Sequence, residues 1–241
     1  MLTATSLLAM VQPGDWLSSI DLKDPFHHVP VAECDRKYFR FRFGETCYQY
    51  TRLPCGYALS HQTFSRCLKA ALVVLLRKGI RLAWNLGDLL VMSSSYEQSI
   101  QHTGELMEYL EYVGFTIDLK RSSPWPTRQA TFLGLLLDTE SGRATLSQER
   151  WADLESSLTP FCHEGARVTY HTVSKLLNLL GVAHQVVPLG LLNLRLLQEW
   201  FSRLVAVYGH DRRFFDEIVT VPSEVLPDLA HWTQAASDRV G

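Results

Sequence analysis

The sequence predicts an α+β protein in which an antiparallel sheet, with its helices on one face, precedes a smaller helical subdomain. Three observations predict it. Short apolar runs come in pairs that a turn separates, two amphipathic helical segments interrupt these pairs, and the pattern becomes helical after Gly142. The order strand, hairpin, helix, hairpin, helix, strand is that of a split βαβ unit. We therefore expect two parts, residues 1–143 and residues 144–241.

Length and composition favour a folded protein without a strong overall charge. The chain has 241 residues, 46% of them hydrophobic, which is enough for one large core or two smaller ones. The formal net charge of −2 at pH 7 gives no general attraction to a polyanion. Any contact with nucleic acid would therefore depend on local clusters of Lys and Arg.

The cysteines and the apolar segments favour an intracellular protein, cytoplasmic or nuclear, without membrane contact. The five cysteines are an odd number without a C-x-x-C pair, and Cys162-His163 has no partner pair at the spacing of zinc ligands. The apolar segments at residues 2–10 and 70–76 are too short to span a bilayer, and the first lacks the basic region of a signal peptide.

The N-terminal third of the chain predicts a buried strand and then a hairpin. Residues 16–22 follow the break at Pro13-Gly14 and are predicted to form a buried strand. Residues 38–43 alternate aromatic and basic side chains, which predicts a half-exposed strand, and residues 46–52 return after a turn. Arg40 and Arg42 then share one face of this hairpin, opposite its phenylalanines.

A helix and a second hairpin follow. Apolar positions at helical spacing predict a helix that Ser60 caps and Gly79 ends. Two short apolar runs, residues 82–84 and 89–92, flank the polar insert Asn85-Leu86-Gly87-Asp88, whose composition is typical of a hairpin turn.

A second helix and two strands complete the first part. Ser95 and Gln98 form a capping box at the start of this helix, and Gly114 ends it. Strands are expected at residues 115–119 and 132–137.

The second part is predicted to be helical. Residues 148–158 follow a Ser147 cap, and helical patterns continue over residues 172–187 and 189–207 with Pro188 between them. We expect these helices to form a subdomain of their own.

Four motifs, in order along the chain, resemble those of reverse transcriptases. Asp21 closes a strand and is followed five positions later by Phe26; Leu53-Pro54-Cys55-Gly56 resembles the L-P-x-G motif. Gly114-Phe115 with Lys120-Arg121-Ser122 resembles the fourth motif, and Phe132-Leu133-Gly134 resembles the primer-grip hairpin. Residues 14–30 and 131–138 are most similar to DIRS-type retrotransposons, which encode a tyrosine recombinase.

The resemblance implies a specific architecture. It implies a ferredoxin-like palm with partial fingers over residues 1–143, and a helical thumb or connection subdomain over residues 144–241. The family's upstream finger strands have no counterpart before Pro13, and no ribonuclease H domain follows Trp232. We therefore expect truncated fingers and a fragment of a longer polyprotein.

The resemblance also implies a damaged metal site. The family holds two Mg²⁺ or Mn²⁺ ions, about 4 Å apart, on an aspartate of the first motif and two adjacent aspartates of a Y-x-D-D turn. Asp21 and Asp88 match two of these catalytic, metal-binding residues, whereas Gly87 stands in place of the third and Asn85 in place of the aromatic residue. Losing roughly 4 kcal/mol of transition-state stabilisation would slow turnover about a thousandfold.

A shift of the hairpin register would not repair this site. Slipping the turn by one residue could move Asp88 into the vacant place, but it would turn every flanking side chain to the opposite face. Ordinary strand-end and turn aspartates are the alternative interpretation of Asp21 and Asp88.

Three residues are candidates for nucleotide binding by resemblance. Phe26 matches the aromatic residue that excludes a ribose 2′-hydroxyl, and Gly56 would let the backbone approach the template base or the dNTP. Lys120, or Arg121 beside it, would lie near the leaving pyrophosphate, and a lysine could give up a proton where a guanidinium could not. The alternatives are a core phenylalanine, a loop glycine and exposed basic residues after a strand.

Arg40 and Arg42 are candidates for nucleic-acid binding, because a finger hairpin would run along the phosphates of an RNA or DNA template-primer. The alternative is a solvated strand face.

Three functional hypotheses follow. The first is a retrotransposon-derived reverse-transcriptase domain, ancestrally a two-metal DNA polymerase that uses dNTPs, whose activity is lost or impaired. The second is a non-catalytic palm that binds nucleic acid or a partner chain. The third is a decaying retroelement remnant without a selected role.

Overall fold

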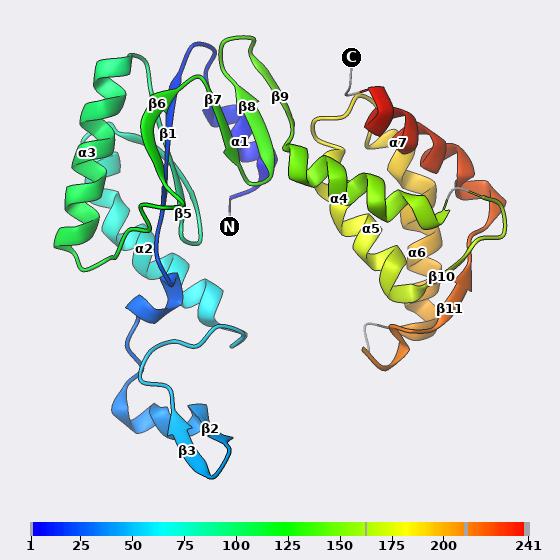
Figure 1. The fold of residues 1–241 in the computed structure, drawn as a ribbon, viewed down its shortest axis with the longest axis horizontal. Coiled ribbons are helices and arrows are strands. Elements are labelled where there is room, and N and C mark those ends of the chain that lie inside the picture. The colour runs from blue at the N-terminus through cyan, green and yellow to red at the C-terminus, as the bar shows by residue number, and fades with distance from the viewer. Residues whose placement is uncertain (1, 162, 210–211, 239–241) are drawn as a thin grey trace. The chain divides into compact units, whose positions relative to one another are not determined.

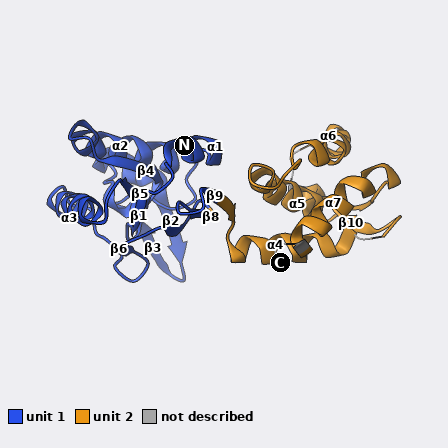
Figure 2. Cartoon of the chain, turned by 90° about the horizontal axis from the view of Figure 1, so that it is seen from above, with its two compact units in different colours: residues 1–133, 137–143 blue, residues 134–136, 144–241 orange. Residues whose placement is uncertain are grey.

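The computed structural model describes residues 2–161, 163–209 and 212–238, so Cys162 lies outside the described residues. The chain forms two compact units, one of residues 1–133 and 137–143 and the other of residues 134–136 and 144–241 (Figure 2). Unit 1 combines sheets with helices and unit 2 is mainly helical, which confirms the predicted α+β class.

The main sheet of unit 1 has four antiparallel strands in the order β4-β5-β1-β6 (Figure 1). Its strands are β1 (Trp16–Asp21), β4 (Arg81–Asn85), β5 (Asp88–Ser93) and β6 (Ser123–Thr127). Helix α2 (Ser60–Arg77) connects β1 to the β4–β5 hairpin, and helix α3 (Tyr96–Tyr112) connects that hairpin to β6. This order and these connections are those of the predicted ferredoxin-like unit.

One face of the sheet carries the core between the strands and the two helices. Leu68 and Leu72 of α2 and Leu106 and Leu110 of α3 are fully buried in the same cluster as Ile20 of β1. Side chains alternate along a strand, so Asp21, next to Ile20, points to the face opposite these helices.

The two helices begin differently. At α3 the predicted cap is confirmed, because the Ser95 hydroxyl accepts a hydrogen bond from the Gln98 amide. The predicted Ser60 cap of α2 is wrong: the N-cap position is Leu59, and the Ser60 hydroxyl instead donates to the Pro54 carbonyl at 2.7 Å. The Pro54 carbonyl belongs to the loop before the helix, and the helical pattern of the sequence gives no sign that it would bind the Ser60 hydroxyl.

The last strand of the sheet is not where the sequence predicts it. Residues 115–119 contribute one isolated bridge, between Ile117 and Leu22, and the strand is β6. Pro124 and Pro126 lie within β6, and because proline lacks an amide donor it argues against a strand in the sequence. The sheet accepts these prolines because β6 is an edge strand.

The strand predicted at residues 132–137 is two strands. β7 (Gln129–Phe132) turns at Leu133-Gly134 into β8 (Leu135–Asp138), and β9 (Arg143–Leu146) completes a three-stranded sheet. Leu133 and Gly134 have φ values of +53° and +77°. Two consecutive left-handed residues are typical of a two-residue hairpin turn.

A small hairpin separate from the main sheet consists of β2 (Arg40–Phe43) and β3 (Thr46–Gln49). The prediction of a half-exposed strand is wrong, because every residue of both strands is exposed. Phe41 lies opposite Tyr48 with stacked rings, and Arg42 lies opposite Cys47. The hairpin therefore has an aromatic face and a basic face, both exposed to solvent.

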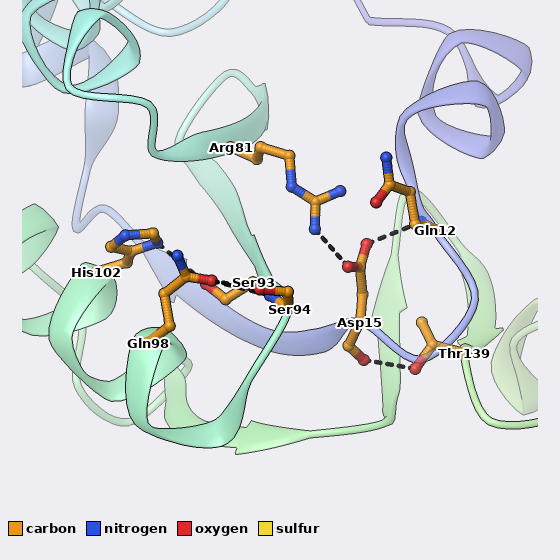
Figure 3. Close-up of polar contacts among 8 residues, drawn as sticks. All are labelled: Gln12, Asp15, Arg81, Ser93, Ser94, Gln98, His102 and Thr139. Atoms are coloured by element: carbon orange, nitrogen blue, oxygen red, sulfur yellow. Dashed lines mark hydrogen bonds and ion pairs between the residues drawn. The ribbon is translucent and has the colours of Figure 1, made fainter.

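A buried carboxylate links three segments of unit 1. The Asp15 carboxylate accepts a hydrogen bond from the backbone N–H of Gln12 and forms an ion pair with Arg81 of β4. The backbone carbonyl of Asp15 accepts a hydrogen bond from the Thr139 hydroxyl (Figure 3). Breaking such a pair leaves an uncompensated charge in the protein, so this contact fixes the start of β1 against β4.

The described part of unit 2 contains four α-helices. They are α4 (Gln148–Leu158), α5 (Tyr170–Ala183), α6 (Arg195–Tyr208) and α7 (Leu226–Asp238), and a short hairpin joins β10 (Arg167–Thr169) to β11 (Ile218–Thr220). The Ser147 cap of α4 is confirmed. The helices predicted at residues 172–187 and 189–207 are α5 and α6 with shifted ends, because residues 184–194 form turns and a 3₁₀ segment.

Unit 1 also contains helix α1 (Ala4–Met10) at its start. None of the helices in the described part of the chain is both long enough and apolar enough to cross a bilayer.

Candidate functional site

The site is formed where β1 ends and β5 begins. Asp21 and Asp88 are direct partners in the antiparallel register of these strands, so their side chains lie on the same face. Asp21 is 8% exposed, whereas Asp88 is exposed. The register therefore brings together the two carboxylates that the sequence assigned to the metal site.

The turn between β4 and β5 is crowded at its glycine. Leu86 takes the left-handed conformation, with a φ of +53°, and Gly87 does not. A β-carbon on Gly87 would lie 3.2 Å and 3.3 Å from Pro25 side-chain carbons and 3.4 Å from the Leu22 carbonyl. A side chain at position 87 would therefore need the Pro25 ring to shift by a few tenths of an ångström, whereas the backbone conformation of Gly87 does not itself call for glycine.

Pro25 is held in this place by a histidine. Pro25 begins a 3₁₀ helix (Pro25–His28), and the His28 ring accepts a hydrogen bond at Nε2 from the Thr116 amide at 2.9 Å. Nδ1 therefore carries the proton and donates to the Pro25 carbonyl, at 3.1 Å. The sequence gives no signal for this bridge, because Thr116 is 88 residues away in the chain.

Arg121 supplies a positive charge to the site. Its Nη2 lies 2.9 Å from Oδ2 of Asp21. Burial, and then the negative charge of Asp88, raises the pKa of Asp21 to about 6, while Arg121 opposes this rise. The sequence assigned Lys120, or Arg121 beside it, to the leaving pyrophosphate, and it gave no signal for the contact between Arg121 and Asp21.

The donor set does not fit a pair of divalent cations. Two such ions need several carboxylates, and the site has Asp21 and Asp88 with a guanidinium on the first. Within residues 2–161, 163–209 and 212–238, no group of three or more His, Cys, Asp or Glu side chains is arranged to hold a metal ion.

The three residues that the resemblance assigns to nucleotide binding have the following surroundings. Phe26 stacks on His61 with ring centroids 5.1 Å apart and meets Phe64 edge to face. Gly56 has a φ of +89°, so its left-handed conformation favours glycine. The Lys120 side chain is exposed, and its amide donates to Asp118.

Arg40 and Arg42 lie on the β2–β3 hairpin. Arg40 donates from Nε to the Gln49 side chain at 3.2 Å, and Arg42 forms an exposed ion pair with Glu45 at 2.8 Å. Both guanidinium groups are in solvent, where such pairs contribute little and can exchange partners.

The raised pKa of Asp21 gives a testable pH dependence. The folded state keeps the proton up to about pH 6, whereas the unfolded chain releases it near 3.8, so the free energy of unfolding falls as pH rises through this window. Asp21→Asn should therefore be as stable as wild type at pH 4 and about 2–3 kcal/mol more stable at pH 7. Urea unfolding at both pH values measures this difference; a difference independent of pH would contradict it.

Comparison with known proteins identifies the family. The family model described as "Reverse transcriptase (RNA-dependent DNA polymerase)" matches residues 3–137. The Gag-Pol polyprotein of Gibbon ape leukemia virus is 26% identical over 248 residues, covering 98% of this chain and 14% of the polyprotein. That of Koala retrovirus is 26% identical over 235 residues, covering 93% of this chain and again 14% of the polyprotein.

Solved structures show the same fold. A foamy viral protease-reverse transcriptase in complex with double-stranded DNA matches with a TM-score of 0.71 and 17% identity, covering 99% of this chain and 38% of that one. Another foamy viral complex, with an RNA/DNA hybrid, matches with a TM-score of 0.69 and 18% identity over 95% of this chain and 28% of that one. This chain therefore spans a small part of its relatives, and it belongs to the reverse transcriptase family.

Proposed function

We propose that this chain is a reverse-transcriptase domain that binds a template-primer and has lost most or all of its polymerase activity. The observation that carries the proposal is the pairing of Asp21 with Asp88 beside a glycine. Phosphoryl transfer of this kind depends on positioning two metal ions, and each lost carboxylate weakens their binding. Mg²⁺ or Mn²⁺ and dNTPs would be used by any activity that remains.

The two parts of the chain would divide this role as in a polymerase. Residues 1–143 would act as palm with partial fingers, and residues 144–241 as a thumb or connection subdomain. The position of the Asp21–Asp88 pair, on the sheet face opposite α2 and α3, supports the first assignment. Phe26, Gly56 and Lys120 would line the nucleotide side of the palm.

Primer extension tests the proposal. With an RNA template, a DNA primer and all four dNTPs, the wild-type chain is expected to give no extension above background in either Mg²⁺ or Mn²⁺. An Asp21→Asn/Asp88→Asn variant serves as the background. Ready extension by the wild-type chain, lost in this variant, would refute the proposal.

Binding to nucleic acid is expected to be weak and salt-dependent. The foamy viral structures contain double-stranded DNA and an RNA/DNA hybrid, which supports such a ligand. Arg40→Gln/Arg42→Gln should weaken binding severalfold for all sequences and lower the slope of log K against log salt by about 1–2. Fluorescence anisotropy across a salt series measures both quantities.

The charge-preserving variant Arg40→Lys/Arg42→Lys is the matched control, because it keeps two cations on the same strand. It should keep the wild-type slope. Equal slopes of log K against log salt for wild type and the glutamine variant would show that the hairpin does not contact the nucleic acid.

A non-catalytic palm that binds a partner chain is the second candidate. The aromatic face of the β2–β3 hairpin favours it, since Phe41, Phe43 and Tyr48 are 45%, 76% and 48% exposed. Exposed apolar patches often mark interaction surfaces. A concentration-dependent oligomer without salt-dependent nucleic-acid binding would support this candidate over the first.

The origin of the chain is a further part of the proposal. We propose a retrotransposon source of the DIRS type, on the similarity of residues 14–30 and 131–138 to such elements. A tyrosine-recombinase reading frame in the flanking genomic sequence would support it. The alternative of a decaying remnant predicts a chain that does not fold cooperatively, which urea unfolding tests.

A further inference from the structure

The guanidinium of Arg121 forms an ion pair with Asp21, the carboxylate that the family resemblance assigns to a metal ion. Nη2 of Arg121 lies 2.9 Å from Oδ2 of Asp21, and the Asp21 side chain is 12% exposed while that of Arg121 is 69% exposed. The arginine therefore approaches from solvent and covers a nearly buried carboxylate. This is the side from which an ion in solution would also have to approach.

The loop that carries Arg121 is tied to the end of β1. The Asp118 amide donates to the Asp21 carbonyl at 2.8 Å, and the Asp21 amide donates to the Ser122 hydroxyl at 2.9 Å. The Ser122 hydroxyl in turn donates to the Asp118 carbonyl at 2.7 Å. Since these bonds lie on both sides of Arg121 in the chain, the loop presents the guanidinium to Asp21 in a defined position.

The charges around Asp21 explain why a cation is favoured there. The negative charges of Asp88 and Asp118 both act on Asp21, and Arg121 is the positive group that opposes them. Without a cation, two carboxylates facing each other across a strand pair would repel. A second cation placed beside the same carboxylate would in turn be repelled by the guanidinium.

The space next to this ion pair is also filled by the chain itself. The Pro25 ring lies where a side chain at position 87 would begin, with its carbons 3.2–3.3 Å from that β-carbon position. The His61 ring stacks on Phe26, with an interplanar angle of 19°. Pro25 and His61 thus pack against Gly87 and Phe26, two of the residues that the resemblance assigns to the metal turn and to the nucleotide.

We infer that Arg121 is a built-in counter-ion of Asp21, which neutralises the remnant site and competes with divalent cations for it. The inference rests on the proposed loss of the two-metal site and adds a second cause for it. A missing carboxylate removes attraction for a cation, whereas Arg121 adds repulsion. The two causes can be separated, because they lie on different residues.

Mn²⁺ binding to the full chain tests the inference. Arg121→Gln should bind Mn²⁺ at least tenfold more tightly than wild type, measured from the electron paramagnetic resonance signal of the free ion. Arg66→Gln is the matched control, because it removes an exposed guanidinium on α2 that has no carboxylate partner among the described side chains. Its Mn²⁺ affinity should stay within about threefold of wild type.

A double variant locates the ion. Asp21→Asn/Arg121→Gln should lose the Mn²⁺ affinity that Arg121→Gln gains, because the carboxylate that would bind the ion is gone. Arg121 is largely exposed, so the single variant is expected to fold, and the amide exchange of β1 and β5 checks this.

Two results would overturn the inference. One is equal Mn²⁺ affinity in wild type, Arg121→Gln and Arg66→Gln; the other is tight wild-type binding that Asp21→Asn removes. Neither result depends on primer extension, so the inference can fail while the proposed loss of activity stands. Conversely, an active wild-type chain would refute the proposed function whatever the Mn²⁺ affinities are.

Discussion

Pro25→Ala/Gly87→Asp is expected to extend a primer at least tenfold faster than Gly87→Asp alone. An aspartate at position 87 would supply the missing third carboxylate, and one ligand is worth about a thousandfold in turnover if it contributes roughly 4 kcal/mol. Its β-carbon, however, would lie 3.2 Å from the Pro25 ring, closer than ordinary contact. Alanine at position 25 removes the two ring carbons beyond Cβ and relieves the nearest of these contacts.

The comparison needs two further proteins, wild type and Pro25→Ala. Pro25→Ala alone should be as inactive as wild type, because it adds no carboxylate. Arg121 is present in all four proteins, so its effect cancels in the comparison. If both aspartate variants are equally silent on an RNA template in Mg²⁺ and Mn²⁺, the defect lies outside the turn and crowding by the Pro25 ring is not its cause.

Trp232→Ala is expected to destabilise unit 2 by about 3–5 kcal/mol, the usual cost of removing a large buried aromatic side chain. Trp232 is fully buried, and its indole Nε1 donates to the Asn193 carbonyl at 2.7 Å. A β-carbon on Gly190 would lie 3.0 Å from the edge of the indole ring, so the turn before the 3₁₀ helix Leu192–Leu194 packs closely on it. The variant would lose this packing and leave the Asn193 carbonyl without its donor.

Amide hydrogen exchange resolves this effect by unit. Protection should fall in α4, α5 and α7 of the Trp232→Ala chain, with β1 and β5 as the internal reference. Trp232→Phe keeps most of the ring but not the donor, so it should cost about 1–2 kcal/mol. Equal protection of α5 in wild type and Trp232→Ala would contradict the central place of this indole in unit 2.

Local signals predicted the elements that local interactions form. The α4 bounds and the Ser147 cap are as expected, because a cap and an apolar spacing lie within a few neighbouring residues. The β4–β5 hairpin is also as expected, since its polar turn and flanking apolar runs are contiguous.

The wrong predictions concern residues whose partners are distant in the chain. The backbone of residues 115–119 bonds to the end of β1 and the residues after it instead of forming a ladder, as the Lys23 amide donates to the Thr116 carbonyl and the Asp118 amide donates to the Asp21 carbonyl. The edge position of β6 allows prolines that its sequence makes unfavourable. Neither fact can be read from apolar periodicity.

The sequence predicted the two carboxylates of the candidate site, but it did not predict the contacts that surround them. Asp21 and Asp88 could be assigned from motifs that surround them in the sequence, and the register places them opposite each other. The approach of Arg121 to Asp21 and of Pro25 to Gly87 depends on how the loops close over the sheet. Such contacts follow from tertiary structure, which single residue types do not specify.

The close approach of the Pro25 ring to Gly87 constrains the order of mutational steps at this site. A large side chain at position 87 and a ring at position 25 would crowd each other, so the proline is accommodated most easily where position 87 is a glycine. The same crowding acts in reverse, because a smaller residue at position 25 would let position 87 take an aspartate without a shift of the ring. The present pair thus makes the change at the turn difficult to undo by one substitution.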